Sequence, residues 1–346
     1  MKLRIGFIGV GAMGLSHLKS MHVACGKDAE AVAIQATNPK NIELALAIAP
    51  KAKVFKSEDE LIQSPLSAIF VSTPNFAHVR LAHEVLRAGK DLFLEKPCGI
   101  TQEECDTLLR VAEKTDRIVM IGHELRYSPY FQKIKALIDA GEIGRPRMVW
   151  CREFRGPMRK KSQDWIQDER RSGGGLVDKN CHHFDLMNWW VSARPKRVVA
   201  FGSCAVNRVI EGPHQVLDHA TVSFEYENEV RGTLQLCMFA RDFPGEDLEL
   251  GVVGDAGMLQ TRISEIQILQ WKRGEQQKEP IIHNIAAKRG EGWGNHLGHD
   301  EIHEAFVACV RERHQPFTSV QACLDGTRLA IAAEESIKAG KLIEIA

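Results

Sequence analysis

The amino-acid sequence predicts an α/β fold, in which a doubly wound parallel sheet precedes an α+β domain with an open, mainly antiparallel sheet. Two observations favour this class. Up to about residue 122, short apolar runs alternate with amphipathic helical stretches, as in buried parallel strands joined by helices. Beyond that point the apolar period falls to two, as in strands with one exposed face. We therefore expect a first domain over 1–122 and a second over 123–346.

Short apolar runs predict the strands of the first domain, because parallel strands that are covered on both faces are apolar throughout. These runs are 3–10, 31–36, 52–55, 68–71, 91–94 and 118–121. Between them, Thr101 with Glu104 and Ser57 with Glu60 form capping boxes that begin two helices. Gly89 ends a third helix, over 77–88, at the position where glycine commonly follows a helix. Repeated strand–helix–strand units of this kind give a parallel, doubly wound sheet.

The second domain begins with a predicted helix over 129–140 and continues with alternating strands. Residues 219–226 and 230–238 alternate apolar and polar side chains on either side of a turn, which predicts an antiparallel hairpin with one buried face. Further strands are expected at 248–253, 258–261 and 266–271, and further helices at 302–311 and 324–339. Helices must cover one face of this sheet, and we expect the other face to be available to a partner subunit.

Composition argues against several classes of protein. The 346 residues carry 45 Lys and Arg against 45 Asp and Glu, so nothing indicates a nucleic acid or an anionic membrane as partner. The nine cysteines include no C-x-x-C pair, which argues against a disulfide framework or a structural zinc cluster and favours a reducing compartment. The sequence shows neither the pattern of a secretory leader nor an apolar run long enough to cross a membrane, and we expect a cytoplasmic protein.

A glycine motif follows the first predicted strand and opens a helix. It reads Gly9-Val10-Gly11-Ala12-Met13-Gly14. In such a motif the first glycine permits a tight turn, the second lets the backbone approach a pyrophosphate, and the third allows close packing of helix and strand. The backbone N–H groups and the helix dipole then hold the phosphates. We predict that a dinucleotide binds at Gly9, Gly11, Ala12, Met13 and Gly14.

The second predicted strand ends without the acidic residue that binds the ribose 2′-hydroxyl of NAD. Ala36 takes that position, and Thr37, Asn38 and then Lys40 follow it. A pocket without acidic groups accepts a 2′-phosphate, which favours NADP. If other groups hold the ribose instead, NAD fits equally, so the predicted cofactor is NAD or NADP.

Further candidates follow the fourth and fifth predicted strands, because ligands of such sheets sit beyond the carboxyl ends of the strands. Lys96, in the sequence Glu95-Lys96-Pro97, is placed to donate to a reacting hydroxyl or carbonyl, although a surface lysine is the simpler interpretation. The residues expected on the nicotinamide side of the cofactor are Thr73, Pro74, Asn75, His78, Glu95 and Lys96.

The densest polar cluster begins with three glycines, 173–175, and contains Asp178 and His182 four positions apart. On a helix these two side chains share a face, and an imidazole oriented by a carboxylate is a good general acid or base. The alternatives are a helix cap and a buried core histidine. A zinc site of Cys181, His182 and His183 is a rival, but adjacent ligands seldom point at one metal, and we expect none.

Taken together, these residues resemble the Gfo/Idh/MocA oxidoreductase family, named for glucose-fructose oxidoreductase and inositol dehydrogenase. The resemblance runs over nearly the whole chain. It rests on the glycine motif with His17, Thr73-Pro74-Asn75 with His78, Ala88-Gly89-Lys90, Glu95-Lys96-Pro97, Arg126-Tyr127 and the glycine triplet that leads to Asp178 and His182. It implies a Rossmann domain followed by an α/β domain whose open sheet face forms a homodimer or homotetramer.

The resemblance also implies roles for individual residues. Lys96, Asp178 and His182 match the catalytic lysine, aspartate and histidine of the family. Lys96 would polarise the reacting oxygen, His182 would exchange the proton as hydride moves to or from nicotinamide, and Asp178 would bind substrate or orient His182. We also expect the Lys96–Pro97 bond to be cis. The residues expected to contact substrate are Lys96, Arg126, Tyr127, Trp165, Asp178, Lys179 and His182, with His296 as a weaker candidate.

One departure from the family pattern concerns the residues between the proposed acid–base partners. Family motifs often read D-x-G-x-H, whereas here Lys179, Asn180 and Cys181 stand between Asp178 and His182. Asn180 thus replaces a frequent glycine, and Lys179 adds a second cation. This difference can change which hydroxyl group is recognised.

The predicted function is hydride transfer between NAD(P) and a secondary hydroxyl or keto group of a sugar, inositol or related polyol. An alternative is a redox-assisted glycosidase or lyase, in which the sugar is oxidised transiently and the cofactor shows no net turnover. A third possibility is a non-catalytic nucleotide sensor. The joint presence of Lys96, Asp178 and His182 argues against a sensor, because a sensor has no need of all three.

Overall fold

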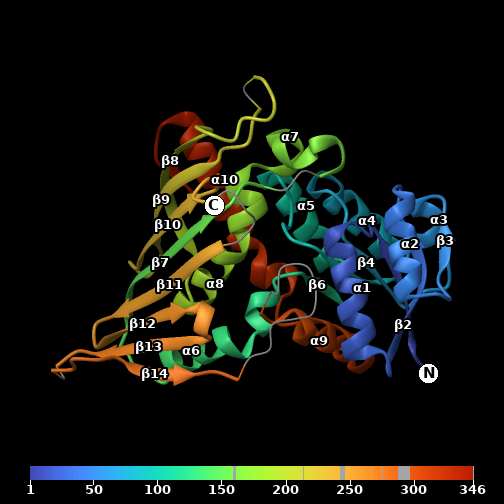
Figure 1. Cartoon of the computed structure of the whole chain (residues 1–346). Coiled ribbons are helices and arrows are strands. Elements are labelled where there is room, and N and C mark those ends of the chain that lie inside the picture. The colour runs from blue at the N-terminus through green and yellow to red at the C-terminus, as the bar shows by residue number, and fades with distance from the viewer. Residues whose placement is uncertain (159–160, 213, 242–245, 275, 287–296, 346) are drawn as a thin grey trace. The chain divides into compact units, whose positions relative to one another are not determined.

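The structure is a computed structural model that describes every residue except 159–160, 213, 242–245, 275, 287–296 and 346 (Figure 1). The chain divides into two compact units. Among the described residues, the first unit comprises those in Met1–Ser128 and Lys288–Leu324, and the second those in Pro129–Ala287 and Asp325–Ala346. The sequence predicted one division between residues 122 and 123. The structure instead returns to the first unit near the end of the chain, because the apolar face of helix α9 packs into the core of that unit.

The first unit is built on a six-stranded parallel sheet with the order β3-β2-β1-β4-β5-β6, which is the Rossmann order. Its strands are β1 Leu3–Ile8, β2 Ala29–Gln35, β3 Lys53–Phe55, β4 Ala68–Val71, β5 Asp91–Leu94 and β6 Val119–Ile121. Its helices are α1 Ala12–Cys25, α2 Pro39–Ile48, α3 Glu58–Ile62, α4 His78–Arg87, α5 Gln102–Glu113 and α9 His299–Glu312. The predicted doubly wound parallel sheet is confirmed.

Three phenylalanines from neighbouring strands form the centre of this core. Phe70 on β4 stacks on Phe7 of β1 at 4.8 Å between ring centroids, and on Phe93 of β5 at 4.4 Å. Phe306 of α9 meets Phe70 and Phe93 edge-on, at 5.2 and 5.6 Å. Each such pair adds roughly 0.5–1.5 kcal/mol beyond the burial of its area. This aromatic cluster explains why α9, far away in the sequence, belongs to the first unit.

The second unit is built on a nine-stranded sheet with the order β14-β13-β12-β11-β7-β10-β9-β8-β15. Its strands are β7 Pro146–Arg155, β8 Pro195–Ser203, β9 His219–Tyr226, β10 Arg231–Cys237, β11 Glu246–Gly254, β12 Gly257–Arg262, β13 Gln267–Lys272, β14 Ile281–Asn284 and β15 Ile343–Glu344. Its helices are α6 Pro129–Asp139, α7 Glu169–Ser172, α8 Cys181–Val191 and most of α10 Val320–Ala339. Among the described strands of this sheet, only β7 and β10 pair in parallel, so the sheet is mainly antiparallel, as predicted.

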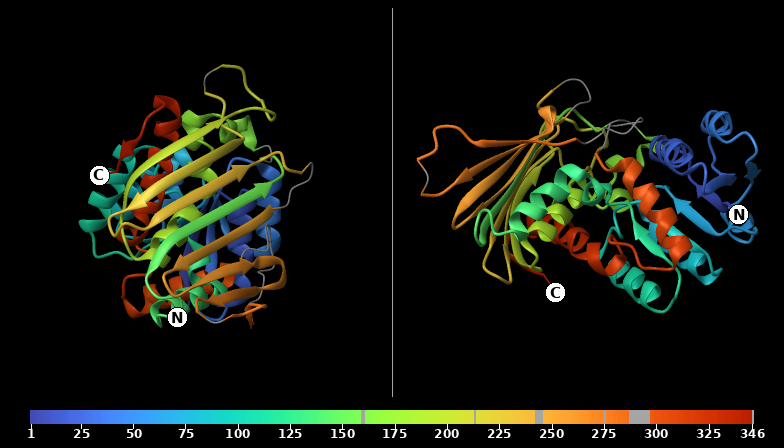
Figure 2. Two further views of the ribbon diagram at one scale, coloured as in Figure 1. Left: turned by 90° about the vertical axis from the view of Figure 1, so that its left-hand side faces the viewer. Right: turned by 90° about the horizontal axis from the view of Figure 1, so that it is seen from below.

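Helices α6, α8 and α10 cover one face of this sheet, and no helix of the described chain covers the other (Figure 2). Strand β9 shows the predicted alternation, with Ala220, Val222, Phe224 and Tyr226 buried and the residues between them exposed or half-buried. The predicted hairpin with β10 is confirmed by the pairing of Thr233 with Ser223. Within the described chain, no helix combines the length and the apolar character that crossing a membrane requires.

Candidate active site

The glycine motif after β1 leaves a backbone cradle at the N-terminus of α1. Gly9 has a positive φ of 84°, and a Cβ on it would lie 2.6 Å from the carbonyl oxygen of Ser72. A Cβ on Gly14 would lie 2.0 Å from the carbonyl oxygen of Gly9, so only glycine lets the helix approach the strand this closely. A Cβ on Gly11 would meet no described atom within 4 Å, and no side chain caps the helix. The N–H groups of this first turn are suited to hold a pyrophosphate.

Two hydroxyl groups at the carboxyl end of β4 lie beside this cradle. The hydroxyl oxygens of Ser72 and Thr73 are buried and have no hydrogen-bond partner among the described residues. Buried hydroxyl groups normally have a partner, so a ligand at this strand end would satisfy them. Together with the glycine cradle, these groups fit a nicotinamide dinucleotide, for which Thr73, Pro74 and Asn75 remain candidate contacts.

The residues predicted to lie near the ribose follow the end of β2, and their role stays a prediction. Strand β2 ends at Gln35, and Ala36 follows half-buried, with Thr37 and Asn38 exposed after it. The side-chain oxygen of Asn38 accepts a hydrogen bond of 3.0 Å from the backbone N–H of Lys40, and thereby caps α2. Asn38 therefore has a structural task of its own, and Ala36, Thr37 and Lys40 remain the candidate positions for the choice between NAD and NADP.

Lys96 follows β5 at the same edge of the sheet. It is half-buried, and its bond to Pro97 is cis, as expected. His78 joins this turn to the preceding loop, with Nδ1 at 3.1 Å from the Pro97 carbonyl oxygen and Nε2 at 3.0 Å from that of Thr73. Burial holds the pKa of His78 below its ordinary value, and a neutral imidazole donates to only one carbonyl at a time. These contacts give His78 the task of connecting two loops.

The predicted acid–base partners lie in the second unit, at the start of one continuous helix. Asp178 is in a π-helical turn, Leu176–Asn180, and His182 is in the first turn of α8. Both are nearly buried, with exposed fractions of 4% and 8%. Since four residues make about one turn of such a helix, their side chains leave it on the same side.

The cation that the sequence places between these partners is paired with one of them. The Nζ atom of Lys179 lies 2.8 Å from Oδ2 of Asp178, and both side chains are largely buried. Lys179 thus acts on the proposed carboxylate itself, which supports the expectation that this departure from the family pattern affects recognition.

Asn180, the second departure, contacts a charged residue that the sequence analysis missed. Its side-chain amide donates to Oε2 of Glu153 at 2.8 Å, and Arg155 donates to Oε1 of Glu153 at 2.7 Å. Burial alone would raise the pKa of Glu153, but the positive charges of His183 and Arg155 hold it below its ordinary value. The missing signal was the alternation along β7, where Val149, Cys151 and then Glu153 face inward. A charged side chain at a core-facing strand position marks a site.

Two of the predicted substrate contacts have other partners in the structure. Arg126 is buried, donates to the carbonyl oxygen of Ala322 at 2.9 Å and faces the Phe317 ring. The hydroxyl of Tyr127 lies 3.3 Å from that of Thr318, and burial raises its pKa to about 12. Both residues thus join the 3₁₀ turn Glu124–Tyr127 to residues 317–322 of the same unit. Trp165 is half-buried in a turn of the second unit, and His296 lies outside the described residues.

The zinc site considered at residues 181–183 differs from the group of possible metal ligands that the structure brings together. Among the described residues, Cys181, His182 and His183 form no group of converging ligand atoms, whereas the ligand atoms of His17, His299 and His303 lie within 4.8 Å of one another. Those three histidines belong to the first unit, and one of them, His17, contacts Glu95, the residue before Lys96. Their arrangement is considered below.

Two family domains match the chain over most of its length. Residues 3–123 match the domain described as an oxidoreductase family with an NAD-binding Rossmann fold, and residues 131–260 match the GFO/IDH/MocA C-terminal domain. The chain belongs to the Gfo/Idh/MocA family of oxidoreductases. Its first unit contains the NAD-binding Rossmann domain of that family.

Relatives in this family share the whole length of the chain. An inositol 2-dehydrogenase of Rhizobium meliloti is 26% identical over 347 residues and covers 100% of both chains. A scyllo-inositol 2-dehydrogenase (NAD(+)) of Bacillus subtilis is 25% identical and covers 99% of this chain and 96% of its own. A solved levoglucosan dehydrogenase, in complex with NADH and levoglucosan, has the same fold, with a TM-score of 0.86 at 19% identity over 100% of both chains.

These matches confirm the family and the enzyme class that the sequence predicted, a nicotinamide-dependent oxidoreductase of CH–OH groups. Lys96 belongs to the first unit, and Asp178 and His182 to the second.

Proposed function

We propose that the protein is an inositol or related polyol dehydrogenase, which oxidises one secondary hydroxyl of a cyclic polyol or sugar to the ketone. The observation that carries this proposal is the joint occurrence of Lys96 after β5 and of Asp178 with His182 at the start of α8. They occur in a chain that matches inositol 2-dehydrogenases from end to end.

The three residues divide the chemistry among them. Lys96, as an ammonium group, donates a hydrogen bond to the reacting oxygen and stabilises the negative charge that develops on it. His182 accepts the hydroxyl proton during oxidation and returns one during reduction. Asp178, with its charge balanced by Lys179, binds a neighbouring hydroxyl or orients the imidazole of His182. The nicotinamide dinucleotide, when bound, supplies the two-electron acceptor for the hydride of the C–H bond.

The choice between NAD and NADP depends on Ala36, because a carboxylate there would bind the 2′-hydroxyl of NAD and repel the 2′-phosphate of NADP. With alanine at this position, we propose that the pocket admits both dinucleotides and favours NADP. Replacing Ala36 by Asp should weaken NADPH binding at least tenfold and leave NADH binding within about threefold. Fluorescence titration of the two reduced cofactors measures this, and equal effects on both would place the ribose elsewhere.

The activity is tested with a panel of inositols, other polyols, sugars, keto-sugars and glycosides, each with NAD and with NADP, while reduced cofactor and products are followed. Net reduction of cofactor with an inositol or another polyol, together with a ketone product, supports the proposal. Cleavage of a glycoside without net change in cofactor would replace it by the redox-assisted glycosidase or lyase.

The uncovered face of the nine-stranded sheet is the surface through which we propose that the protein forms a homodimer or homotetramer. Phe201 on β8 and Met148 on β7 point outward there, with exposed fractions of 74% and 53%. Thr221, the cross-strand partner of Phe201, is also exposed, so these side chains share that face. Light scattering after size-exclusion chromatography gives the oligomeric state, and a monomer at micromolar concentration would overturn this part of the proposal.

The cysteines support action in a reducing compartment, and we propose the cytoplasm. All nine are free thiols in the structure, and seven of them are buried. Free thiols persist where glutathione and thioredoxin keep them reduced.

A further inference from the structure

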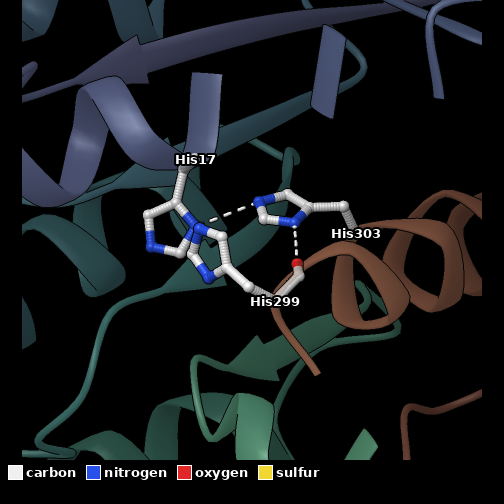
Figure 3. Close-up of side chains that lie close together, drawn as sticks. All are labelled: His17, His299 and His303. Carbon is white, nitrogen blue, oxygen red and sulfur yellow. Dashed lines mark hydrogen bonds between the residues drawn. The ribbon is translucent and has the colours of Figure 1, made fainter. Parts of the chain in front are cut away.

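A chain of buried hydrogen bonds lies behind the turn that carries Lys96, and three of its members are shown in Figure 3. His17 is on α1, His299 and His303 are on α9, and Glu95 follows β5. His17 Nε2 lies 2.7 Å from Oε1 of Glu95, and His17 Nδ1 lies 3.0 Å from Nε2 of His303. His303 Nδ1 lies 2.5 Å from the carbonyl oxygen of His299. None of the four residues is more than 6% exposed.

The positions of the protons in this series of hydrogen bonds follow from which atoms can donate. A carbonyl oxygen only accepts, so Nδ1 of His303 carries a proton. Burial, and the charges of His17 and His299, hold the pKa of His303 well below its ordinary value. His303 is therefore neutral, its Nε2 is an acceptor, and Nδ1 of His17 must donate to it.

The same reasoning fixes the charge of His17. Burial alone would raise the pKa of Glu95, but the hydrogen bond and the charge of His17 outweigh it, so this pKa lies below its ordinary value. Glu95 is thus a carboxylate, and a carboxylate only accepts. His17 must then donate from Nε2 as well as from Nδ1, which makes it an imidazolium. A buried ion pair results, with exposed side-chain fractions of 2% for His17 and 8% for Glu95.

This pair stands directly beside the lysine that the proposed function requires. The positive charge of Lys96 lowers the pKa of Glu95, and by reciprocity the carboxylate stabilises the charged form of Lys96. His17 offsets that effect, because its own positive charge is paired with the same carboxylate. Glu124 adds a negative charge that acts on both Glu95 and His303. The net field on Lys96 therefore depends on the proton of His17.

We infer that His17 is a positioning residue for Lys96, which neutralises the buried carboxylate of Glu95 and anchors the Glu95–Lys96–Pro97 turn to α1 and α9. The structure makes room for this carboxylate, since a Cβ on Gly122 would lie 2.8 Å from its Oε1. Without the charge of His17, Glu95 holds the proton on Lys96 more tightly and fixes its ammonium group toward the carboxylate. The inference deepens the proposed function and rests on it only for the role of Lys96.

A proton accounts for this geometry without a metal ion. Two nitrogen atoms coordinated to one tetrahedral zinc ion at ~2.0–2.1 Å lie roughly 3.4 Å apart, whereas His17 Nδ1 and His303 Nε2 are 3.0 Å apart, an ordinary hydrogen-bond distance. The remaining contact of His17, to Glu95, is satisfied in the same protonation state. Metal analysis of the purified protein is nevertheless one arm of the test.

The test separates the charge of His17 from its hydrogen bond. In the His17→Gln variant the side-chain amide can still donate to Glu95 but carries no charge, Glu95→Gln removes the negative charge, and the double variant removes both. The readout is the rate at which an amine-specific reagent labels Lys96, followed by mass spectrometry across pH. We expect His17→Gln to slow labelling at pH 8 by roughly tenfold, the effect of one added unit in the pKa of Lys96. The double variant should return to within about threefold of Glu95→Gln.

Turnover provides a second readout, and its result is independent of the labelling result. If the protein oxidises a polyol, kcat of His17→Gln should fall about tenfold with its pH profile displaced to higher pH, and NADH binding should stay within about twofold. His83→Gln, an exposed histidine of the same unit, is the matched control and should change neither readout. If no polyol is oxidised, the proposed function fails while the labelling result still decides the inference.

Two outcomes would overturn the inference. Lys96 labelling and kcat that are unchanged in a folded His17→Gln variant would show that the charge has no effect on Lys96. One equivalent of bound metal in the wild type, lost in His303→Ala, would show that a metal ion takes the place of the shared proton. Melting temperatures of all variants establish that each is folded before it is compared.

Discussion

Two buried carboxylates lie next to residues of the proposed active site, one in each unit, and they are neutralised in different ways. In the first unit, Glu95 faces an imidazole, with His17 Nε2 at 2.7 Å. In the second unit, Glu153 faces a guanidinium, with Arg155 Nη1 at 2.7 Å, and also accepts from the amide of Asn180. An arginine is always charged in proteins, whereas a histidine gains or loses its charge near neutral pH.

The difference teaches that the two regions respond differently to pH and to mutation. The environment of Lys96 depends on the proton of His17, whereas Glu153, beside Asn180, is balanced by the permanent cation Arg155 together with His183. A third buried carboxyl, Glu334 on α10, accepts from the backbone N–H of Leu176 at 2.8 Å, and burial raises its pKa to about 7. The three buried carboxyl groups thus differ in how they are balanced: Glu153 has an arginine with a histidine, Glu95 has a histidine, and Glu334 is largely neutral near pH 6.

The largest effect is expected when Lys96, the residue beside Glu95 in the first unit, is replaced. Lys96→Ala removes the donor that stabilises charge on the reacting oxygen and leaves Glu95 with His17 as its cation. We expect kcat to fall by about a thousandfold or more, with NADH affinity within about threefold of the wild type. Steady-state kinetics and fluorescence titration measure the two quantities. The exposed Lys114→Ala is the control, and turnover that survives in Lys96→Ala would sink the catalytic assignment.

The second-largest effect is expected when the ion pair between Arg155 and Glu153 is broken. Arg155→Met leaves Glu153 buried beside Asn180 and His183 without its permanent cation, and we expect the free energy of unfolding to fall by roughly 3 kcal/mol. This is at the lower end for a buried pair, because a quarter of the Arg155 side chain, 24%, is exposed. Adding Glu153→Gln should recover most of the loss. Urea denaturation of the single and double variants tests this, and a double variant no more stable than Arg155→Met would contradict it.

The same contrast explains how much of the molecule could be predicted from its sequence. The capping boxes at Thr101 and Ser57, the Rossmann strand order and the cis bond before Pro97 follow from local rules, and all are found in the structure. The sequence analysis did not predict β7, β8, β14 or α2. Strand β7 was missed because its inward face carries Glu153, whose cost is offset by residues distant in the sequence.

The pair of His17 and Glu95 shows the same limit within a site. Both residues belong to motifs that the sequence made visible, but their contact depends on the approach of α1 to the end of β5. His303 is added from α9, which lies 286 residues beyond His17. Local patterns name residues that chemistry needs, whereas burial and pairing across the fold decide which of them carry a charge.

The smallest effect concerns the contribution of Glu334 to stability, which is seen most clearly when the pH is varied. Its pKa is raised from 4.5 to about 7 by burial, which outweighs the Leu176 N–H and Lys338, and Glu169 adds to the shift. The folded protein therefore holds a proton that the unfolded chain loses above pH 4.5, so stability falls as pH rises from 4.5 through 7. Between pH 5 and 8 this group should cost about 2 kcal/mol.

Glu334→Gln keeps an acceptor for the N–H of Leu176 and removes the titrating group. The free energy of unfolding of the variant, relative to that of the wild type, should therefore rise by about 2 kcal/mol between pH 5 and 8. Urea denaturation at several pH values measures the difference. Glu335→Gln, one residue further along α10 and exposed, should track the wild type at every pH. A constant gap between Glu334→Gln and the wild type would mean that Glu334 is ionised throughout, so that the Gly173–Gly175 segment packs on a charged carboxylate.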